Sequence, residues 1–134
     1  MSVTNRDIYN NALVCIGERV NGENTADYEE RAPYLIASFC SLAKSTDKSI
    51  RKAEGLDAQP KFSPVFISLD DQFPLCDRLM PSAAVYVAAM LVIDEDADLS
   101  DSLYDKYCDS MATLAMSGGL ESSCETIAEK YFFD

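Results

Sequence analysis

The stretch from Phe73 to Ala115 constrains the fold most, because it holds two helix-like apolar patterns separated by a short acidic connector. From Leu79 to Leu91, large apolar residues recur every three or four positions, which predicts a helix with one buried face. The acidic run from Asp94 to Asp98 interrupts this pattern, and a second helical pattern follows. The sequence therefore predicts an antiparallel helical hairpin against which the other elements pack.

The second helix of the hairpin should begin with Asp98 or Ser100 as its N-cap, because either side chain can accept a hydrogen bond from a first-turn N–H group. The pair Gly118-Gly119 is expected to end it. Its predicted apolar stripe consists of Tyr104, Tyr107, Cys108, Met111, Leu114 and Ala115.

Two more helices are predicted before the hairpin. Thr4 and Asp7 form a capping-box pattern for a short helix that ends near Gly17. A second helix runs from Thr25 through Ser41 and contains Pro33, so we expect a kink there or a helix that begins near residue 32.

The segment between these helices and the hairpin is less regular. The pattern from Ser45 to Glu54 is weakly helical, and Gly55 to Pro64 reads as a loop. Val65 to Leu69 is the one credible strand or extended segment. As a strand it could pair with Lys61 and Phe62 as a small ribbon or add to another chain.

The predicted fold is mainly α: a small four-helix bundle with at most a short β-element near residues 62–69 and a C-terminal tail helix. At 134 residues the chain has room for one domain with a real core. We assign residues 1–119 to a helical domain and residues 120–134 to a docking tail. The predicted core comprises Ile8, Leu13, Ile16, Leu35, Ile36, Phe39, Val87, Met90, Leu91, Tyr107, Met111 and Leu114.

The tail carries a compact apolar face. Ser122 and Glu125 make a second capping-box pattern, after which the apolar side chains of Ile127, Tyr131, Phe132 and Phe133 follow. So short a helix is marginal alone in water, so we expect these four residues to dock, either outside their own bundle or back onto it.

Charge is unevenly distributed along the chain. Of the net charge of −12, residues 1–64 contribute −1 and residues 65–134 contribute −11. This balance argues against a protein that grips nucleic acid through its phosphates. On the second hairpin helix, Asp101, Asp105 and Asp109 recur every four residues, opposite the stripe that contains Tyr104 and Tyr107.

A local excess of positive charge occurs in the middle of the chain. It comes from Lys44, Lys48, Arg51, Lys52 and Lys61. One interpretation is a solvated face balanced by Asp47, Glu54 and Asp57, and the other is a contact for an acidic partner surface.

The residues that most enzymes need are missing or scattered. The chain has no histidine, which excludes a Cys-His or Ser-His catalytic pair, and its five cysteines form no CxxC motif and read as small buried hydrophobes. Asp94, Asp96 and Asp98 match the opening of a calcium-binding loop, but Leu99 replaces the required glycine. We therefore expect no enzyme activity, metal or cofactor. There is no run of about 18 apolar residues and no secretory pattern at the N-terminus, so we expect a soluble, intracellularly made protein.

The order of elements resembles the head–tail connector (adaptor) proteins that lie beneath the portal of tailed phages. The resemblance covers roughly residues 5 to 117 and is a diffuse pattern. It rests on Asn11 to Gly17, Tyr28-Glu29-Glu30-Arg31-Ala32, Ile67-Ser68-Leu69, Phe73-Pro74-Leu75, the alanine-rich stretch from Ala83 to Leu91, and Tyr104-Asp105-Lys106-Tyr107.

The resemblance implies a small helical bundle that forms a ring, commonly dodecameric, around the DNA exit channel of the virion neck. Such proteins dock on the portal and receive a stopper or tail-completion protein, after assembly in the host cytoplasm. For Asp101, Asp105 and Asp109 two interpretations stay open: a solvated face that aids solubility, or, in a ring of this kind, the wall of a channel through which DNA passes unbound. In such a ring the tail residues would dock on the portal or a neighbouring subunit.

Two alternatives stay open at this point. One is another neck or tail-completion protein of the same virion. The other is a bacterial helical adaptor or regulator with a small-ligand pocket in its bundle.

Overall fold

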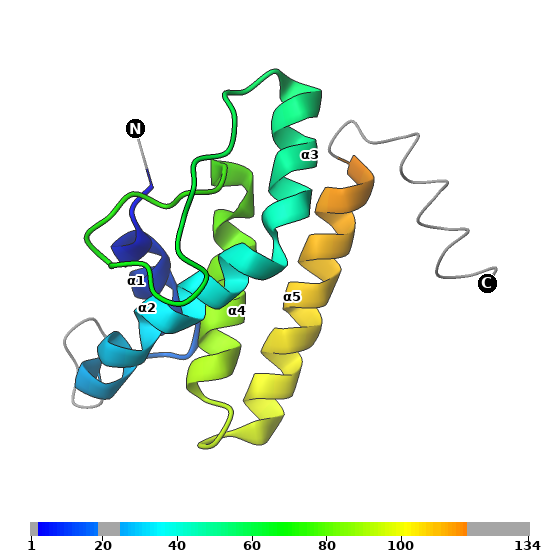
Figure 1. The fold of residues 1–134 in the computed structure, drawn as a ribbon. Helices are drawn as coiled ribbons and strands as arrows, with labels where there is room; N and C mark the ends of the chain where they lie inside the picture. The colour runs from blue at the N-terminus through cyan, green and yellow to red at the C-terminus, as the bar shows by residue number, and fades with distance from the viewer. Residues whose placement is uncertain (1–2, 19–24, 118–134) are drawn as a thin grey trace.

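The computed structural model describes residues 3–18 and 25–117, which form five α-helices and no strand (Figure 1). The helices are α1 (Asn5–Cys15), α2 (Thr25–Leu42), α3 (Lys44–Glu54), α4 (Met80–Leu91) and α5 (Ala97–Ser117), with a short 3-10 helix η1 (Asp77–Leu79) before α4. The prediction of a mainly α, small helical bundle is confirmed. The tail, 120–134, lies outside the described residues.

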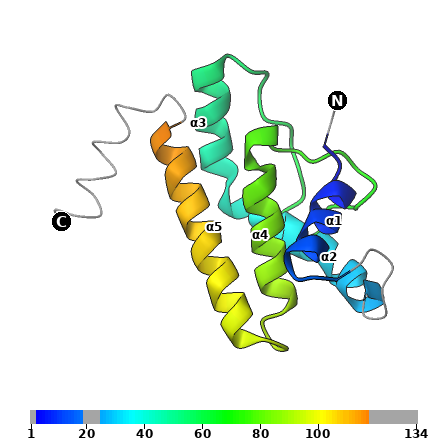
Figure 2. The ribbon, with the colours of Figure 1, turned by 180° about the vertical axis from the view of Figure 1, so that it is seen from behind.

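Helix α4 is the centre of the bundle, where α1, α2 and α5 all pack against it (Figures 1 and 2). Eight of its twelve residues are buried, and four of these are alanines, so neighbouring backbones can approach closely. Helices α4 and α5 run antiparallel, which confirms the predicted hairpin.

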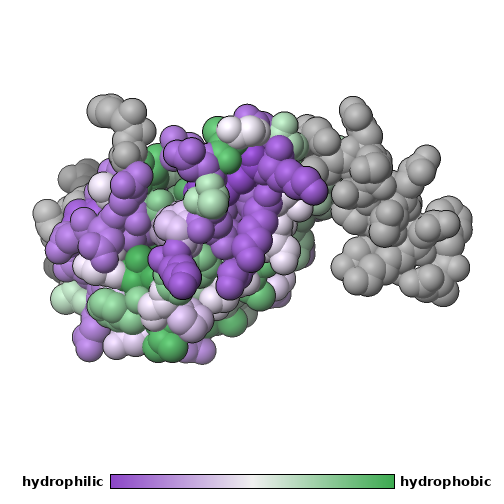
Figure 3. All heavy atoms as spheres, turned by 45° about the horizontal axis from the view of Figure 1, so that its top comes forward, coloured by the Kyte–Doolittle hydropathy of each residue, from purple (hydrophilic) through white to green (hydrophobic). Residues whose placement is uncertain are grey.

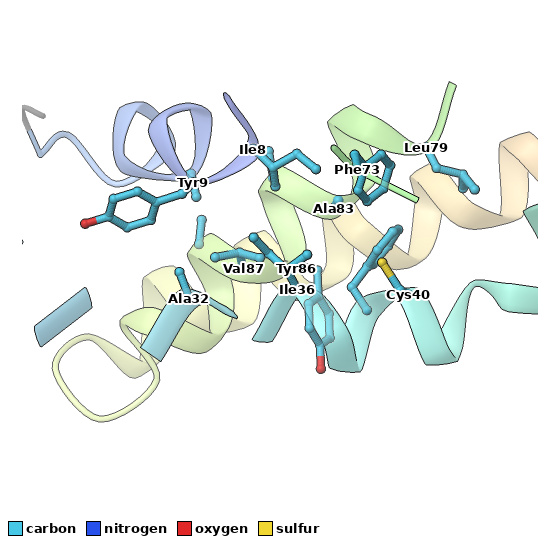
Figure 4. Close-up of a cluster of buried hydrophobic side chains, with 14 of the residues drawn as sticks. Ile8, Tyr9, Ala32, Ile36, Cys40, Phe73, Leu79, Ala83, Tyr86 and Val87 are labelled. Carbon is cyan, nitrogen blue, oxygen red and sulfur yellow. The ribbon is translucent and has the colours of Figure 1, made fainter. Parts of the chain in front are cut away.

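The hydrophobic core is continuous and rich in aromatic rings (Figure 4). Phe39 lies at its centre, with its ring centroid 6.4 Å from that of Phe73, 5.9 Å from Tyr86 and 6.1 Å from Tyr107. Seven predicted core residues are buried: Ile8, Leu13, Ile36, Phe39, Val87, Leu91 and Tyr107. The other five, Ile16, Leu35, Met90, Met111 and Leu114, are partly buried against the core.

The N-terminus of α1 is joined to the loop that precedes α4. The predicted capping box of Thr4 and Asp7 is present. The free N–H groups of the first turn find partners in the loop, because the N–H of Asn5 donates to the carbonyl of Asp71 at 3.0 Å and that of Arg6 donates to Leu69 at 2.9 Å. The loop is therefore held in place by helix capping, although it has no regular structure.

In the middle of the chain the predictions are confirmed only in part. The helix predicted from Thr25 through Ser41 is present as α2 and is helical on both sides of Pro33, which excludes the alternative start near residue 32. The segment 65–69 is not a strand and does not pair with residues 61 and 62; the one β-bridge among the described residues joins Thr4 to Gln72. The N–H of Ile67 instead donates to the carbonyl of Pro33 at 3.2 Å, so this segment is tied to a helix.

The start of α5 also differs from the prediction. The helix begins at Ala97, and the side chain of Asp96 accepts a 3.0 Å hydrogen bond from the N–H of Leu99, so Asp96 is the cap rather than Asp98 or Ser100. Ser100 is buried and its hydroxyl donates to the carbonyl of Ala89 at 2.9 Å. This hydrogen bond links the two helices of the hairpin.

In the part of the chain that the structure describes, no helix is both long and apolar enough to cross a lipid bilayer.

Candidate interaction surfaces

The acidic row predicted on α5 is on the molecular surface. Asp101, Asp105 and Asp109 are all exposed, and successive members are separated by about 6 Å along the helix axis. Among residues 3–18 and 25–117, no ion pair involves a side chain of α5, and this includes the exposed Lys106. The negative charge of this row is therefore not compensated within the described chain.

The row is beside an aromatic side chain, where the sequence had placed it opposite. Tyr104 is 41% exposed and Cys108 is also exposed, whereas α5 buries Ser100, Leu103 and Tyr107. The buried face of α5 is therefore offset by part of a helical turn from the predicted stripe, so that part of the stripe faces the solvent. Asp101, Tyr104 and Asp105 line a hollow of about 490 Å³ together with Met90 and Ile93. This surface can offer carboxylates and an aromatic ring to the same partner.

The connector between α4 and α5 adds acidic groups with structural roles. Glu95 accepts a hydrogen bond from the hydroxyl of buried Tyr28, and burial together with this bond raises the pKa of Tyr28 to about 12. Asp96 caps α5. Among the described residues, no three acidic or thiol side chains are grouped so that they could hold a metal ion.

A second charged row lies on α3. Lys44, Lys48 and Lys52 are exposed at four-residue intervals, and none is in an ion pair within the described chain. The ammonium group of Lys44 lies 5.9 Å from the ring centroid of Phe62, which places an aromatic face beside this basic row. Figure 3, which brings this end of the molecule forward, shows mainly hydrophilic side chains with apolar ones between them.

Asp47 does not belong to the solvated face to which the sequence assigned it. Its carboxylate is fully buried and accepts hydrogen bonds from Arg51 Nε (2.7 Å), Gln59 Nε2 (2.8 Å) and the N–H of Cys76 (2.7 Å). Burial alone would raise the pKa of Asp47, but the hydrogen bonds outweigh it and lower that pKa below its ordinary value. The one sequence signal for this site was the Asp47–Arg51 spacing, one turn apart and flanking buried Ile50.

A hollow of about 930 Å³ opens between the C-terminal half of α3 and the loop 56–78. Leu56, Phe62 and Phe66 supply apolar surface, and Arg51 and Arg78 supply positive charge. Arg78 is paired with Glu54 across the hollow, and Arg51 is held by Asp47 and by loop carbonyls. Because its wall mixes charged groups with apolar rings, this hollow suits an amphipathic segment.

Phe66 continues this apolar surface toward α2. Its ring lies edge-on to that of Tyr34, with centroids 5.2 Å apart, and both residues are exposed beside exposed Val65. Apolar side chains in such a group favour contact with another protein surface.

The remaining predicted residues are the cysteines and the docking residues of the tail, and only some of the predictions about them are confirmed. Cys40 and Cys76 are buried, as expected, and burial raises the pKa of Cys40 to about 12. Cys15 and Cys108 are exposed, contrary to the prediction. The proposed docking residues Ile127, Tyr131, Phe132 and Phe133 lie outside the described residues.

No protein-family model, curated protein or solved structure matches the chain.

Proposed function

We propose that the chain is a structural head–tail connector (adaptor) of a tailed phage, which acts in the virion neck after assembly in the host cytoplasm. In this function it forms a ring, of about twelve copies by the resemblance, beneath the portal protein. The ring extends the DNA channel and joins the head to a stopper or tail-completion protein. It performs no catalysis and needs no cofactor.

The observation that carries this proposal is the row of Asp101, Asp105 and Asp109 on the outer face of α5. All three carboxylates are exposed and none is in an ion pair within the described chain. A wall of uncompensated negative charge repels phosphates, so that duplex DNA slides past without adhering. Repetition around a ring multiplies this field, and salt limits its reach to about 8 Å at physiological ionic strength.

The helical fold supports the proposal in a second way. The bundle has a compact core built on α4, while charged rows on α3 and α5 and the rings of Tyr34 and Phe66 face outward. A rigid body with several distinct outward surfaces suits a part that contacts neighbours, portal and stopper at once. In this proposal, Ile127, Tyr131, Phe132 and Phe133 dock on the portal or a neighbouring subunit.

The first experiment measures mass with and without a portal ring. A connector joins the purified portal as an oligomer, whereas a protein of another class leaves the portal unchanged. The second replaces Asp101, Asp105 and Asp109 together by Asn and compares DNA ejection from assembled particles. Unaltered ejection, or a ring structure with this row on its outer wall, would end the channel assignment.

The hollow of about 930 Å³ beside α3 favours a second candidate, a bacterial helical regulator that binds a small ligand there. Its mixed charges and apolar rings are compatible with a ligand, but Arg51 and Arg78 already have carboxylate partners. A regulator would not bind the portal, so the mass measurement would show the portal ring unchanged. Another neck protein of the same virion would bind a neck component other than the portal.

A further inference from the structure

We propose that the lysine row of α3 and the hollow beside it receive the C-terminal tail, residues 120–134, of a neighbouring copy of this chain. This inference rests on the proposed function, because a ring requires each copy to contact the next through two different surfaces. It goes further by assigning those surfaces to particular residues.

The receiving surface has two chemical parts. Lys44, Lys48 and Lys52 present three ammonium groups at four-residue intervals, exposed and without ion-pair partners in the described chain. Beside them, the ring of Phe62 lies under Lys44 and also lines the hollow, so basic and apolar surface are continuous. Exposed Leu56 extends the apolar part.

The tail sequence matches both parts. Glu121, Glu125 and Glu129 recur at the same four-residue interval as the lysines, and the apolar residues Ile127, Tyr131, Phe132 and Phe133 accompany them. If the tail is helical, its carboxylates are spaced by about 6 Å along one face, as the ammonium groups of α3 are. Aromatic side chains are the groups that most often anchor a segment in an apolar hollow.

The tail is also long enough to reach another copy. Seventeen residues follow Ser117, the last residue of α5, which ends toward the same end of the molecule as α3 (Figures 1 and 2). Extended chain spans about 3.3 Å per residue, and Gly118-Gly119 can take backbone conformations that other residues avoid. The chain after Ser117 is therefore long enough to reach a neighbouring copy.

The α5 acidic row is a weaker match for the lysines. Asp101, Asp105 and Asp109 have the right spacing and charge, but Tyr104 is the one aromatic residue beside them. The tail brings carboxylates together with three aromatic rings, which the hollow can take up. The occupant that fits both parts of the surface is the tail.

The test is a cross-link between two copies of the full chain that differ in size. Both carry Cys15→Ser and Cys108→Ser, which remove the exposed thiols of the described chain. The larger, tagged copy carries Lys48→Cys and Cys124→Ser, and the smaller copy keeps its native Cys124 in the tail. A short bismaleimide is added to the mixture, and mixed dimers are counted on a denaturing gel.

The matched control places the thiol elsewhere on the same helix, with Ala53→Cys in place of Lys48→Cys; Ala53 is exposed and faces away from the lysine row. We expect at least tenfold more mixed dimer with Lys48→Cys than with Ala53→Cys. Equal yields would overturn the proposal. A third variant, which carries Lys48→Cys and keeps Cys124, tests for docking within one chain. Cross-linking of this variant that is confined to single chains would also overturn the proposal, because the tail would then dock on its own α3. If Lys48→Cys lowers the unfolding temperature, Lys52→Cys replaces it.

A charge exchange supplies an independent test. Reversing Lys44, Lys48 and Lys52 to Glu should abolish the mixed cross-link reported by a thiol at Leu56→Cys, and reversing Glu121, Glu125 and Glu129 to Lys as well should restore it. If the mixed cross-link is restored by reversing Asp101, Asp105 and Asp109 to Lys instead, the proposal is overturned. The partner of the lysine row would then be the acidic row of α5. Portal binding is measured in parallel with the first cross-link. Portal binding without preferential cross-linking of Lys48→Cys refutes this inference alone, and preferential cross-linking without portal binding refutes the connector function alone.

Discussion

Asp47 and Arg51 form a 2.7 Å ion pair one turn apart on α3, in which the Asp47 side chain is fully buried and the Arg51 side chain is 15% exposed. The same guanidinium donates to the carbonyls of Asp57 and Pro74, while the carboxylate accepts the N–H of Cys76. The pair therefore joins α3 to both ends of the loop that leads to α4. Arg51 also lines the hollow proposed to receive the tail.

Replacing Asp47 by Ala should lower the free energy of unfolding by about 3–5 kcal/mol, because it leaves Arg51 largely buried without a carboxylate. Urea denaturation measures the change. The control is Asp57→Ala in the same loop, where the side chain is exposed and the expected change is within about 0.5 kcal/mol. Equal effects of the two variants would show that the buried pair does not hold the loop.

The same carboxylate should make stability depend on acid pH. The pKa of Asp47 is lowered in the folded state, so its contribution is present above the unfolded pKa of about 3.9 and is lost as the pH falls through the folded value. We expect the stability difference between the wild type and Asp47→Asn to narrow as the pH is lowered from about 5 toward 3. Denaturation curves at several pH values test this, and a constant difference would contradict it.

Tyr28 should make stability depend on pH in the alkaline range. Its folded pKa is raised from 10.0 to about 12, so the stability that it contributes is present below pH 10 and lost as the pH rises through the folded value. The difference between the wild type and Tyr28→Phe should therefore narrow above pH 10. Tyr34→Phe, the same chemical change at an exposed position, is the matched control.

The degree of burial separates two core substitutions in the hairpin. Leu91 is 1% exposed, so Leu91→Ala should cost about 2–5 kcal/mol. Met111 is partly buried at the edge of the core, so Met111→Ala should cost about 1 kcal/mol, in proportion to the smaller apolar area that it removes from water. A cost below about 0.5 kcal/mol at Leu91 would contradict the assigned helix face.

The sequence predicted the hairpin, the capping box at Thr4 and most of the core, because these depend on local spacing. The prediction failed where contacts between residues distant in sequence determine which side chains are buried. The stripe of α5 was misplaced at Tyr104 and Cys108, because an apolar residue at helical spacing can lie at the edge of a buried face. Buried Asp47 was missed because its partners, Gln59 and Cys76, are distant in sequence.

The segment from Val65 to Leu69 shows a related limit. Its β-branched and aromatic residues favour a strand, but among the described residues no neighbouring strand is present to pair with it. Hydrogen bonds to α1 and α2 hold it instead, through the carbonyl of Leu69 and the N–H of Ile67. Of the candidate surfaces, the sequence predicted the acidic row and the basic middle stretch. The hollow between α3 and the loop 56–78 emerged only from the packing of the structure.

The acidic row should carry a measurable cost in the isolated chain. Asp105 lies one turn from both Asp101 and Asp109, and like charges at this spacing destabilise a helix by about 0.2–0.5 kcal/mol per pair. Asp105→Asn removes both repulsions, so it should stabilise the chain by about 0.4–1 kcal/mol at low salt, with a smaller gain at 0.5 M salt because the charges are screened. Thermal unfolding at the two salt concentrations measures this.

The matched control for that variant is Asp98→Asn. Asp98 lies in the first turn of α5, where a carboxylate interacts favourably with the helix dipole, so its neutralisation should destabilise by about 0.3–1 kcal/mol. The two substitutions make the same chemical change on one helix and are expected to act in opposite directions. A loss of stability in Asp105→Asn would mean that the row makes favourable contacts within the chain, and its three carboxylates would then not be free to face a DNA channel.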